Sequence, residues 1–153
     1  MAANSFDVQP AIAALASIVR SALQPGTLND VFDDIPNLQS TRAPVMFFDY
    51  RNGRNERDVY GGFRRVWNVD CIALMGLAQD VALTDKAMKD FIAAFYNLLA
   101  INNTLSDTVS EATITQDESA FYPMLGTGGQ AINYGALIFR LEVAQEIALG
   151  GNC

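Results

Sequence analysis

The stretch TDKAMKDFIAAFYNLLAIN, residues 84–102, decides the architecture because it predicts one long amphipathic helix. Thr84 and Asp85 would open this helix with a capping hydroxyl and with a carboxylate in the positive first turn. A helix of about 18 residues is roughly 27 Å long, so a sheet or a second helix must cover its apolar stripe. The apolar side chains recur at three- and four-residue spacing and share one face: Met88, Phe91, Ile92, Phe95, Leu98 and Leu99.

Composition and charge indicate one globular domain spanning residues 1–153. Half of the residues are hydrophobic and 18% are charged, which is enough for a core and unlike a disordered chain. The formal net charge of −7 disfavours wrapping of nucleic acid, which depends on neutralising phosphates. We see no targeting signal and no apolar run long enough to cross a membrane.

The residues available for chemistry are few. The chain has no histidine, which removes histidine-based acid–base catalysis and the commonest metal ligand. Its two cysteines, Cys71 and Cys153, provide neither a metal-binding spacing nor a disulfide framework. Cys71 lies in an apolar strand pattern, so we expect it to be buried, and this cysteine usage suits a reducing compartment.

The order of the remaining patterns predicts the fold class. A second amphipathic helix is expected over residues 7–23, with Ser5 as a possible cap and Pro25-Gly26 as its stop. A helix, a short strand, two strands, a helix and two strands predict an α+β fold. We expect a mainly antiparallel sheet with both helices packed on one face. The expected strands cover residues 31–32, 44–50, 66–75, 109–115 and 132–147, with a loop over 117–131.

The segment 51–65 is the only basic concentration in this acidic chain, and we expect it to be an exposed hairpin or loop arm. Asn52-Gly53 is a strong turn signal within it. Tyr60 and Phe63 leave an RNA or single-strand contact open, and simple solvation is another interpretation. We favour protein contact with a neighbouring copy or partner. The candidate contact residues are Arg51, Arg54, Arg57, Arg64 and Arg65.

Other motifs favour structural interpretations over chemical ones. The acidic run 30–34 lacks the glycine and the spaced glutamate of a calcium loop, so a solvated turn is the better reading. The glycines within 126–129 lack the lysine and the helix of a phosphate loop. Asp49 with Tyr50, or 117–118 near Tyr122, would be the acid groups of a small enzyme or ligand-binding domain.

The layout resembles the tail-terminator, or tail-completion, proteins of long-tailed bacteriophages. The similar features begin with the amphipathic helix from Val8 to Leu23 and with Val31-Phe32-Asp33 before Pro36. The paired-strand stretch from Pro44 to Met75, helix 84–102 and the closing strands that end in Tyr134–Val143 follow. The resemblance covers nearly the whole chain, with residues 148–153 as a short tail.

This resemblance implies a structural virion protein that catalyses no reaction and needs no cofactor or metal. Such proteins form a homohexameric ring at the head-proximal end of the tail tube. The ring ends tube polymerisation, contacts tube and head-completion proteins, and lets DNA pass without specific binding or membrane contact. We expect assembly in the host cytoplasm. The acids expected to line the lumen are Asp70, Glu111, Glu142 and Glu146.

Two alternatives remain open from the sequence. One is another head–tail connector, such as a stopper, or a relative of the tube protein. Two strong helices argue against the tube protein, whose pattern is closer to a complete β-sandwich. The other is a small ligand-binding α+β domain, for which the acid groups named above would be the site.

Overall fold

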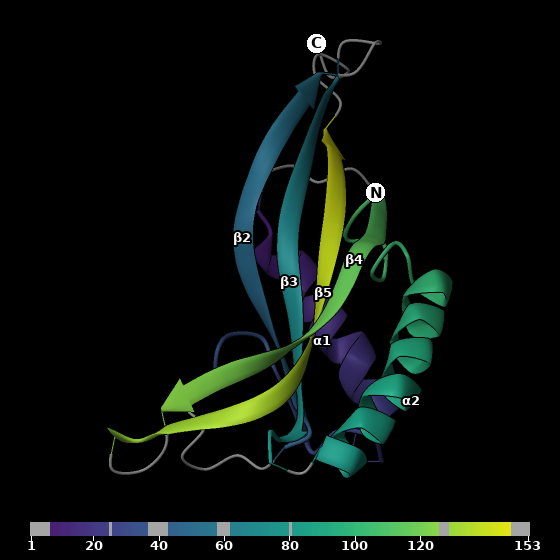
Figure 1. The fold of residues 1–153 in the computed structure, drawn as a ribbon. Coiled ribbons are helices and arrows are strands. Elements are labelled where there is room, and N and C mark those ends of the chain that lie inside the picture. Colours follow the sequence, from purple (N-terminus) through teal and green to yellow (C-terminus); the bar gives the residue numbers. More distant parts are fainter. Residues whose placement is uncertain are drawn as a thin grey trace.

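The computed structural model describes residues 7–24, 26–36, 43–57, 62–79, 81–125 and 129–147. It is an α+β fold with one five-stranded sheet, ordered β1-β2-β3-β5-β4, and two helices (Figure 1). All neighbouring strands are antiparallel except β1, which is parallel to β2. The predicted class and the mainly antiparallel sheet are therefore confirmed. The elements are α1 (Gln9–Leu23), β1 (Asp30–Phe32), β2 (Val45–Arg57), β3 (Phe63–Leu77), α2 (Val81–Ile101), β4 (Glu111–Leu125) and β5 (Ala131–Ile147).

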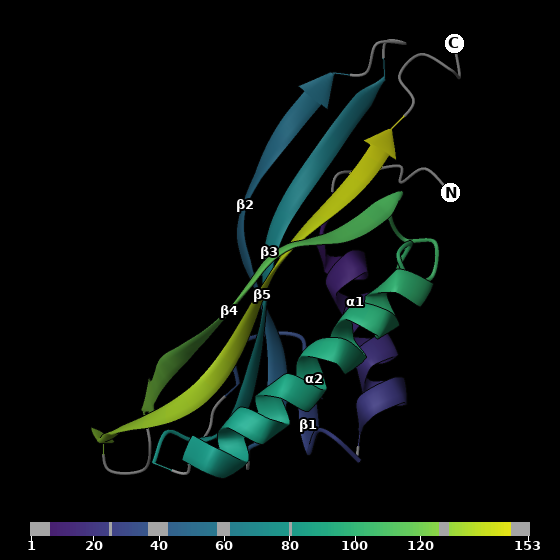
Figure 2. The same ribbon diagram turned by 45° about the vertical axis from the view of Figure 1, so that its right-hand side comes forward.

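The main hydrophobic core joins residues of both helices to one set of alternating strand side chains. Phe91 and Phe95 of α2 pack on Phe139 of β5, with ring centroids 4.5 Å apart for Phe95 and Phe139. Leu15 and Val19 of α1 belong to the same cluster. Figure 2 shows both helices beside the sheet. We refer to the sheet face that contributes Phe139 as the helix side.

The opposite face of the sheet has a smaller apolar cluster of its own. Val45, Phe47, Ile72 and Leu74 are buried there, and Tyr134 of β5 joins them. Their cover includes the far end of β4, where the Tyr122 ring meets Phe47 edge to face at 5.9 Å. Beyond this contact the paired ends of β4 and β5 diverge from β2 and β3 (Figure 1), as expected for long twisted strands.

Both helices begin away from their predicted caps. Ser5 lies outside the described residues, and Asp7 instead accepts the Gln9 N–H at 2.9 Å, just before α1. Helix α2 begins at Val81, so Thr84 is inside its first turns and not at its cap. The Thr84 side chain is buried and its hydroxyl donates to the Leu77 carbonyl at 3.3 Å. Thr84 thus ties α2 to the end of β3.

Two local predictions are wrong because strand pairing overrides the turn signals. Asn52-Gly53 is not a turn: it lies inside β2, with Asn52 opposite Asn68 after an irregularity next to Tyr50. Residues 117–125 are not a loop, because β4 stays paired with β5 as far as Leu125. Within the segment 51–65, residues 51–57 accordingly belong to β2 and residues 63–65 to β3, whereas residues 58–61 lie outside the described part. The same holds for three glycine-cluster positions, 126–128.

Candidate functional site

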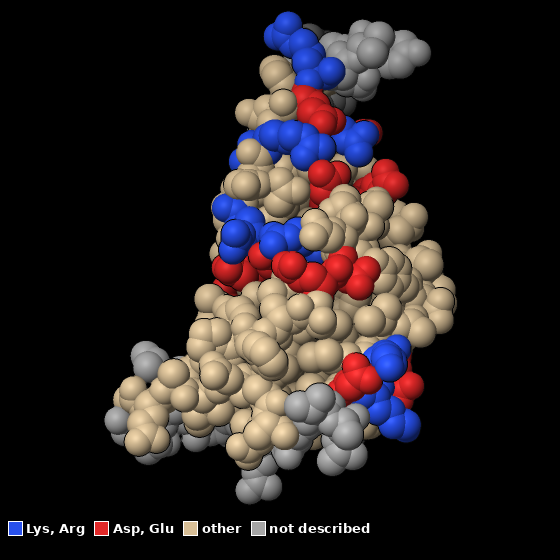
Figure 3. Space-filling model, viewed as in Figure 1, with Lys and Arg blue, Asp and Glu red and all other residues tan. Residues whose placement is uncertain are grey.

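A strip of charged side chains covers the sheet face opposite the helix side, toward the ends of β2 and β3 that lie nearest their connection. Strand alternation places these side chains on one face, and Figure 3 shows blue and red groups in alternating bands. We call this set the charged strip. Its members are Asp49, Arg51, Arg54, Glu56, Arg64, Asp70, Glu111, Glu118, Arg140, Glu142 and Glu146.

Asp70 is the buried centre of the charged strip. Its carboxylate lies 3.4 Å from Arg140 and 3.5 Å from Arg51, and Arg140 also reaches Glu118 at 3.1 Å. Burial raises the pKa of Asp70, while the charges of Arg140 and Arg51 act in the opposite direction. Asp70 therefore lies between two guanidiniums whose charges only partly offset the effect of burial on its pKa.

Arg54 links the exposed carboxylates of the strip. It lies 3.0 Å from Glu142 and 2.9 Å from Glu56, and the hydrogen bonds to these two groups raise the pKa of Arg54. Arg64 lies 3.8 Å from Glu56 and 3.9 Å from Glu111. Exposed pairs of this kind are screened by water and salt, so we expect them to shape the surface more than the stability.

The structure pairs residues that the sequence assigned to separate surfaces. Three acids expected in the lumen, Asp70, Glu111 and Glu142, meet the contact arginines Arg51, Arg64 and Arg54 within one chain. Glu146 stands opposite Arg64 in the β3–β5 register and is exposed. The alternation of side chains along each strand could have predicted that these acids and arginines share one face. The register of paired strands fixes which residues lie on each face of a sheet. Arg140 pairs with Asp70 and Glu118, and neither Arg140 nor Glu118 was among the residues predicted for either surface.

Arg57 and Arg65 belong to the helix side. The Arg65 guanidinium lies over the Trp67 ring at 4.4 Å and donates to Asn55 at 3.1 Å. Arg57 lies over Phe63 at 5.7 Å. These cation–π contacts hold both arginines against their own hairpin, so the five predicted contact residues do not form one basic patch.

The groups considered for catalysis do not converge. Asp49 and Tyr50 are neighbours on a strand and point to opposite faces. Asp117 accepts the Tyr96 hydroxyl at 2.7 Å, which raises the pKa of Tyr96, whereas Glu118 faces Arg140 on the other side of β4. Burial raises the pKa of the Cys71 thiol, so it stays protonated. Among the described residues no cluster of His, Cys, Asp or Glu could hold a metal ion.

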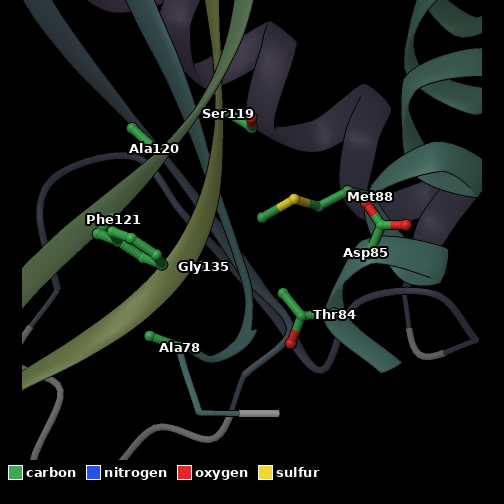
Figure 4. A pocket seen from close by; sticks show the side chains of 8 residues that line it. All are labelled: Ala78, Thr84, Asp85, Met88, Ser119, Ala120, Phe121 and Gly135. Carbon is green, nitrogen blue, oxygen red and sulfur yellow. The ribbon is translucent and has the colours of Figure 1, made fainter. Parts of the chain in front are cut away.

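A hollow of about 320 Å³ lies between α2 and the β4–β5 hairpin (Figure 4). Met88 points into this space from α2, and Phe121 borders it from β4. The one carboxylate in the lining, Asp85, pairs with Lys89 at 2.9 Å outside the hollow. The lining is mainly apolar and lacks the convergent polar groups that usually orient a small ligand.

Gly135 of β5 allows α2 to approach the sheet at this hollow. An added Cβ would lie 2.6 Å from Thr84 Cγ2 and 3.1 Å from Met88 Cε. Since Thr84 is buried and branched, we expect Gly135→Ala to lower the free energy of unfolding by about 1–3 kcal/mol. Urea denaturation measures this change.

The matched control is Gly26→Ala, because nothing lies within 4 Å of a Cβ added there. We expect this variant to stay within about 0.5 kcal/mol of the wild type. Equal effects of the two substitutions would contradict the close approach of α2 at Gly135.

Neither a family model nor a curated protein matches the sequence. Across the described ranges, no helix has the length and apolar character of a membrane span. The fold and the charged strip therefore supply the basis for a functional inference.

Proposed function

We propose that this chain is a structural subunit of a phage tail, of the tail-terminator type. Six copies would form a ring at the head-proximal end of the tail tube and stop its polymerisation. The ring would join the tail to the head-completion proteins, and DNA would pass through its lumen. The protein would act in the virion, without a cofactor and without catalysis.

The charged strip is the observation that carries this proposal. It is a broad open surface on which basic and acidic groups of four strands pair with one another (Figure 3). Most of its side chains are already paired within the chain, which favours a surface that touches passing or assembling molecules over a small-ligand site. The layout of helices and strands, which resembles the tail-terminator proteins, supports the same class.

The net negative charge of the charged strip suits a channel through which DNA passes. Seven of its side chains are carboxylates and four are guanidiniums, so an acidic excess remains after pairing. An acidic wall repels phosphates and limits adhesion of DNA. This excess is smaller than the predicted acid lining alone would give, because Arg51, Arg54 and Arg64 share the same face.

The position of the helices also favours a subunit orientation in which the charged strip faces the lumen. We infer that both helices cover the helix side of the sheet, since Leu15 of α1 and Phe95 of α2 join one cluster with Phe139. That arrangement would leave the charged strip free to face the lumen. The β2–β3 hairpin, continuing to residues 57 and 63, would then reach beyond the helices toward the tube or an adjacent copy.

The test combines assembly with charge reversal on the strip. We expect light scattering and negative-stain images to show rings of about six subunits, as closed homo-oligomers are common. We expect Glu142→Arg with Glu146→Arg to slow DNA ejection from completed phage, because the lining would attract phosphates.

The matched control is Asp85→Arg with Asp90→Arg on α2. It makes the same change of net charge at two exposed carboxylates outside the strip. Normal ejection is expected with this control. Ejection slowed equally by both pairs, or by neither, would contradict a lumen lined by the strip. If removal of the protein leaves tails unjoined and tubes overlong, the terminator role is supported. Normal tails in its absence would overturn that role.

A further inference from the structure

The sheet has two unlike free edges. Strand β1 pairs only with residues 45–47 of β2, so the outer edge of residues 48–57 has no neighbouring described strand. Strand β4 pairs only with β5 among the described strands. At its other edge the Ala112 N–H donates to the Asn103 carbonyl at 2.7 Å. Long open edges in soluble proteins are sites where another chain can add.

Large apolar side chains are exposed next to both edges. Tyr50 of β2 keeps 42% of its surface exposed. Beside β4, Tyr96 of α2 is 37% exposed and donates its hydroxyl to Asp117. A hollow of about 240 Å³ lies between α2 and β4, where Tyr96, Ala100 and Ile114 border it. One edge thus has a partly exposed aromatic ring, which packs edge to face on Trp67 at 5.6 Å. The other has a recess partly lined by apolar side chains.

The register across the sheet places the features of the two edges at the same positions along the strand direction. Tyr50 is paired with Val69, Val69 with Leu141, and Leu141 with Ile114 at the hollow. In the same way Arg54 leads through Val66 and Ala144 to Glu111. Tyr50 and Ile114 lie on the helix side, whereas Arg54 and Glu111 lie on the charged strip. Both charged residues also have partners in their own chain, Glu142 for Arg54 and Arg64 for Glu111. A neighbour placed side by side would therefore meet apolar with apolar groups and would add an acidic group beside Arg54.

Strand direction permits this neighbour. Strands β2 and β5 run one way, and β3 and β4 run the other way. Copies related by rotation about an axis along the strands would place β4 of one antiparallel to β2 of the next, continuing the alternation. Because the two edges differ, the contact is head-to-tail and closes into a ring when the rotation allows.

We propose that the β2 edge of one copy seats against the β4 edge of a second copy, with Tyr50 entering the hollow beside Ile114 and Arg54 lying next to Glu111. This contact rests on the proposed ring and specifies how its subunits meet. Both edges carry an irregularity at this height, next to Tyr50 in β2 and next to Ile114 in β4. Bulges interrupt backbone pairing, so side chains supply most of the contact.

Cysteine pairs test the contact directly. The Tyr50→Cys/Ala100→Cys variant is made with Cys153→Ser, and Cys71 is buried. Mild oxidation is expected to give a ladder of cross-linked dimers, trimers and larger species. Neither single variant should give it, because each head-to-tail contact uses one residue from each edge. The control pair is Tyr50→Cys/Ala93→Cys, in which the second cysteine is an exposed α2 position outside the hollow.

The absence of a ladder, or an equal ladder with the control pair, would overturn the contact. Cross-linking by Tyr50→Cys alone would also overturn it, since it would indicate a two-fold dimer. If the protein joins tails but the cysteine pair gives no ladder, this contact is rejected and the proposed function is kept. A ladder from a chain that does not act on tails would reject the function and keep the contact.

Charge exchange gives an independent measurement. We expect Arg54→Glu or Glu111→Arg to weaken self-association roughly tenfold by removing a pair and adding a like-charge contact. The double variant Arg54→Glu/Glu111→Arg should recover most of the loss. Sedimentation velocity measures both. A double variant as weak as the sum of the two singles would overturn the pairing of Arg54 with Glu111.

Discussion

Replacing Phe139 with alanine is expected to lower the free energy of unfolding by about 3–5 kcal/mol, the largest effect of any single change considered for this protein. The ring is fully buried and contacts the rings of Phe91, Phe95 and Tyr96. Its removal would leave a cavity at the point where α2 meets β5. Chemical denaturation followed by fluorescence of Trp67, the only tryptophan, measures the loss.

The matched control is Phe121→Ala. Phe121 is also an aromatic residue of the β4–β5 hairpin, but 74% of its surface is exposed. We expect its replacement to change the free energy of unfolding by about 0.5 kcal/mol or less. Similar losses from Phe139→Ala and Phe121→Ala would contradict the packing of α2 on the sheet.

The second large effect is expected at the centre of the charged strip. Arg140→Leu removes one of the two guanidiniums beside buried Asp70. Losing one partner of a fully buried pair typically costs about 3–5 kcal/mol. Arg51 remains and Arg140 is partly exposed, so we expect a loss of about 2 kcal/mol at neutral pH.

This loss should depend on pH in a defined direction. Burial raises the pKa of Asp70 in the folded protein above its ordinary value of 3.8. The stability linked to this group is therefore present below that ordinary value and is lost as pH rises through the folded pKa. Arg140 is the strongest influence that lowers the pKa, so its removal should move the folded value further upward. Arg140→Leu should thus be more harmful at neutral than at acid pH.

Asp70→Asn separates this charge effect from lost packing. It removes the ionisable group, so the double variant Arg140→Leu/Asp70→Asn should recover much of the stability at neutral pH. Comparison of the wild type, the two single variants and the double variant gives the coupling free energy between Arg140 and Asp70. A double variant whose losses simply add, with no change between acid and neutral pH, would contradict an ion-paired Asp70.

Much of the fold follows from periodicity that is local in the sequence. The four-residue spacing of Phe91, Phe95 and Leu99 is enough to predict the buried face of α2. Alternation along residues 137–143 similarly predicts the buried side of β5. These patterns depend on which residues must leave water, and each element carries that information by itself.

Turn and end positions were less predictable because they depend on partner strands. Asn52-Gly53 has a strong hairpin preference, yet β3, which is itself paired with β5, continues alongside it and keeps β2 extended. Glu118 to Leu125 contains residues typical of loops, including Pro123, but its pairing with β5 keeps it a strand. As an edge strand, β4 tolerates this proline without losing an inner ladder.

The sequence by itself determined the α+β class, the two amphipathic helices, the buried Cys71 and the acidic balance, because composition and spacing are properties of each segment. Only the tertiary structure decided that Arg54 lies against Glu142, that Asp70 sits between Arg51 and Arg140, and that the sheet keeps two unlike open edges. These features require the register of strands distant in sequence. A shift of one residue in that register would move every side chain to the opposite face.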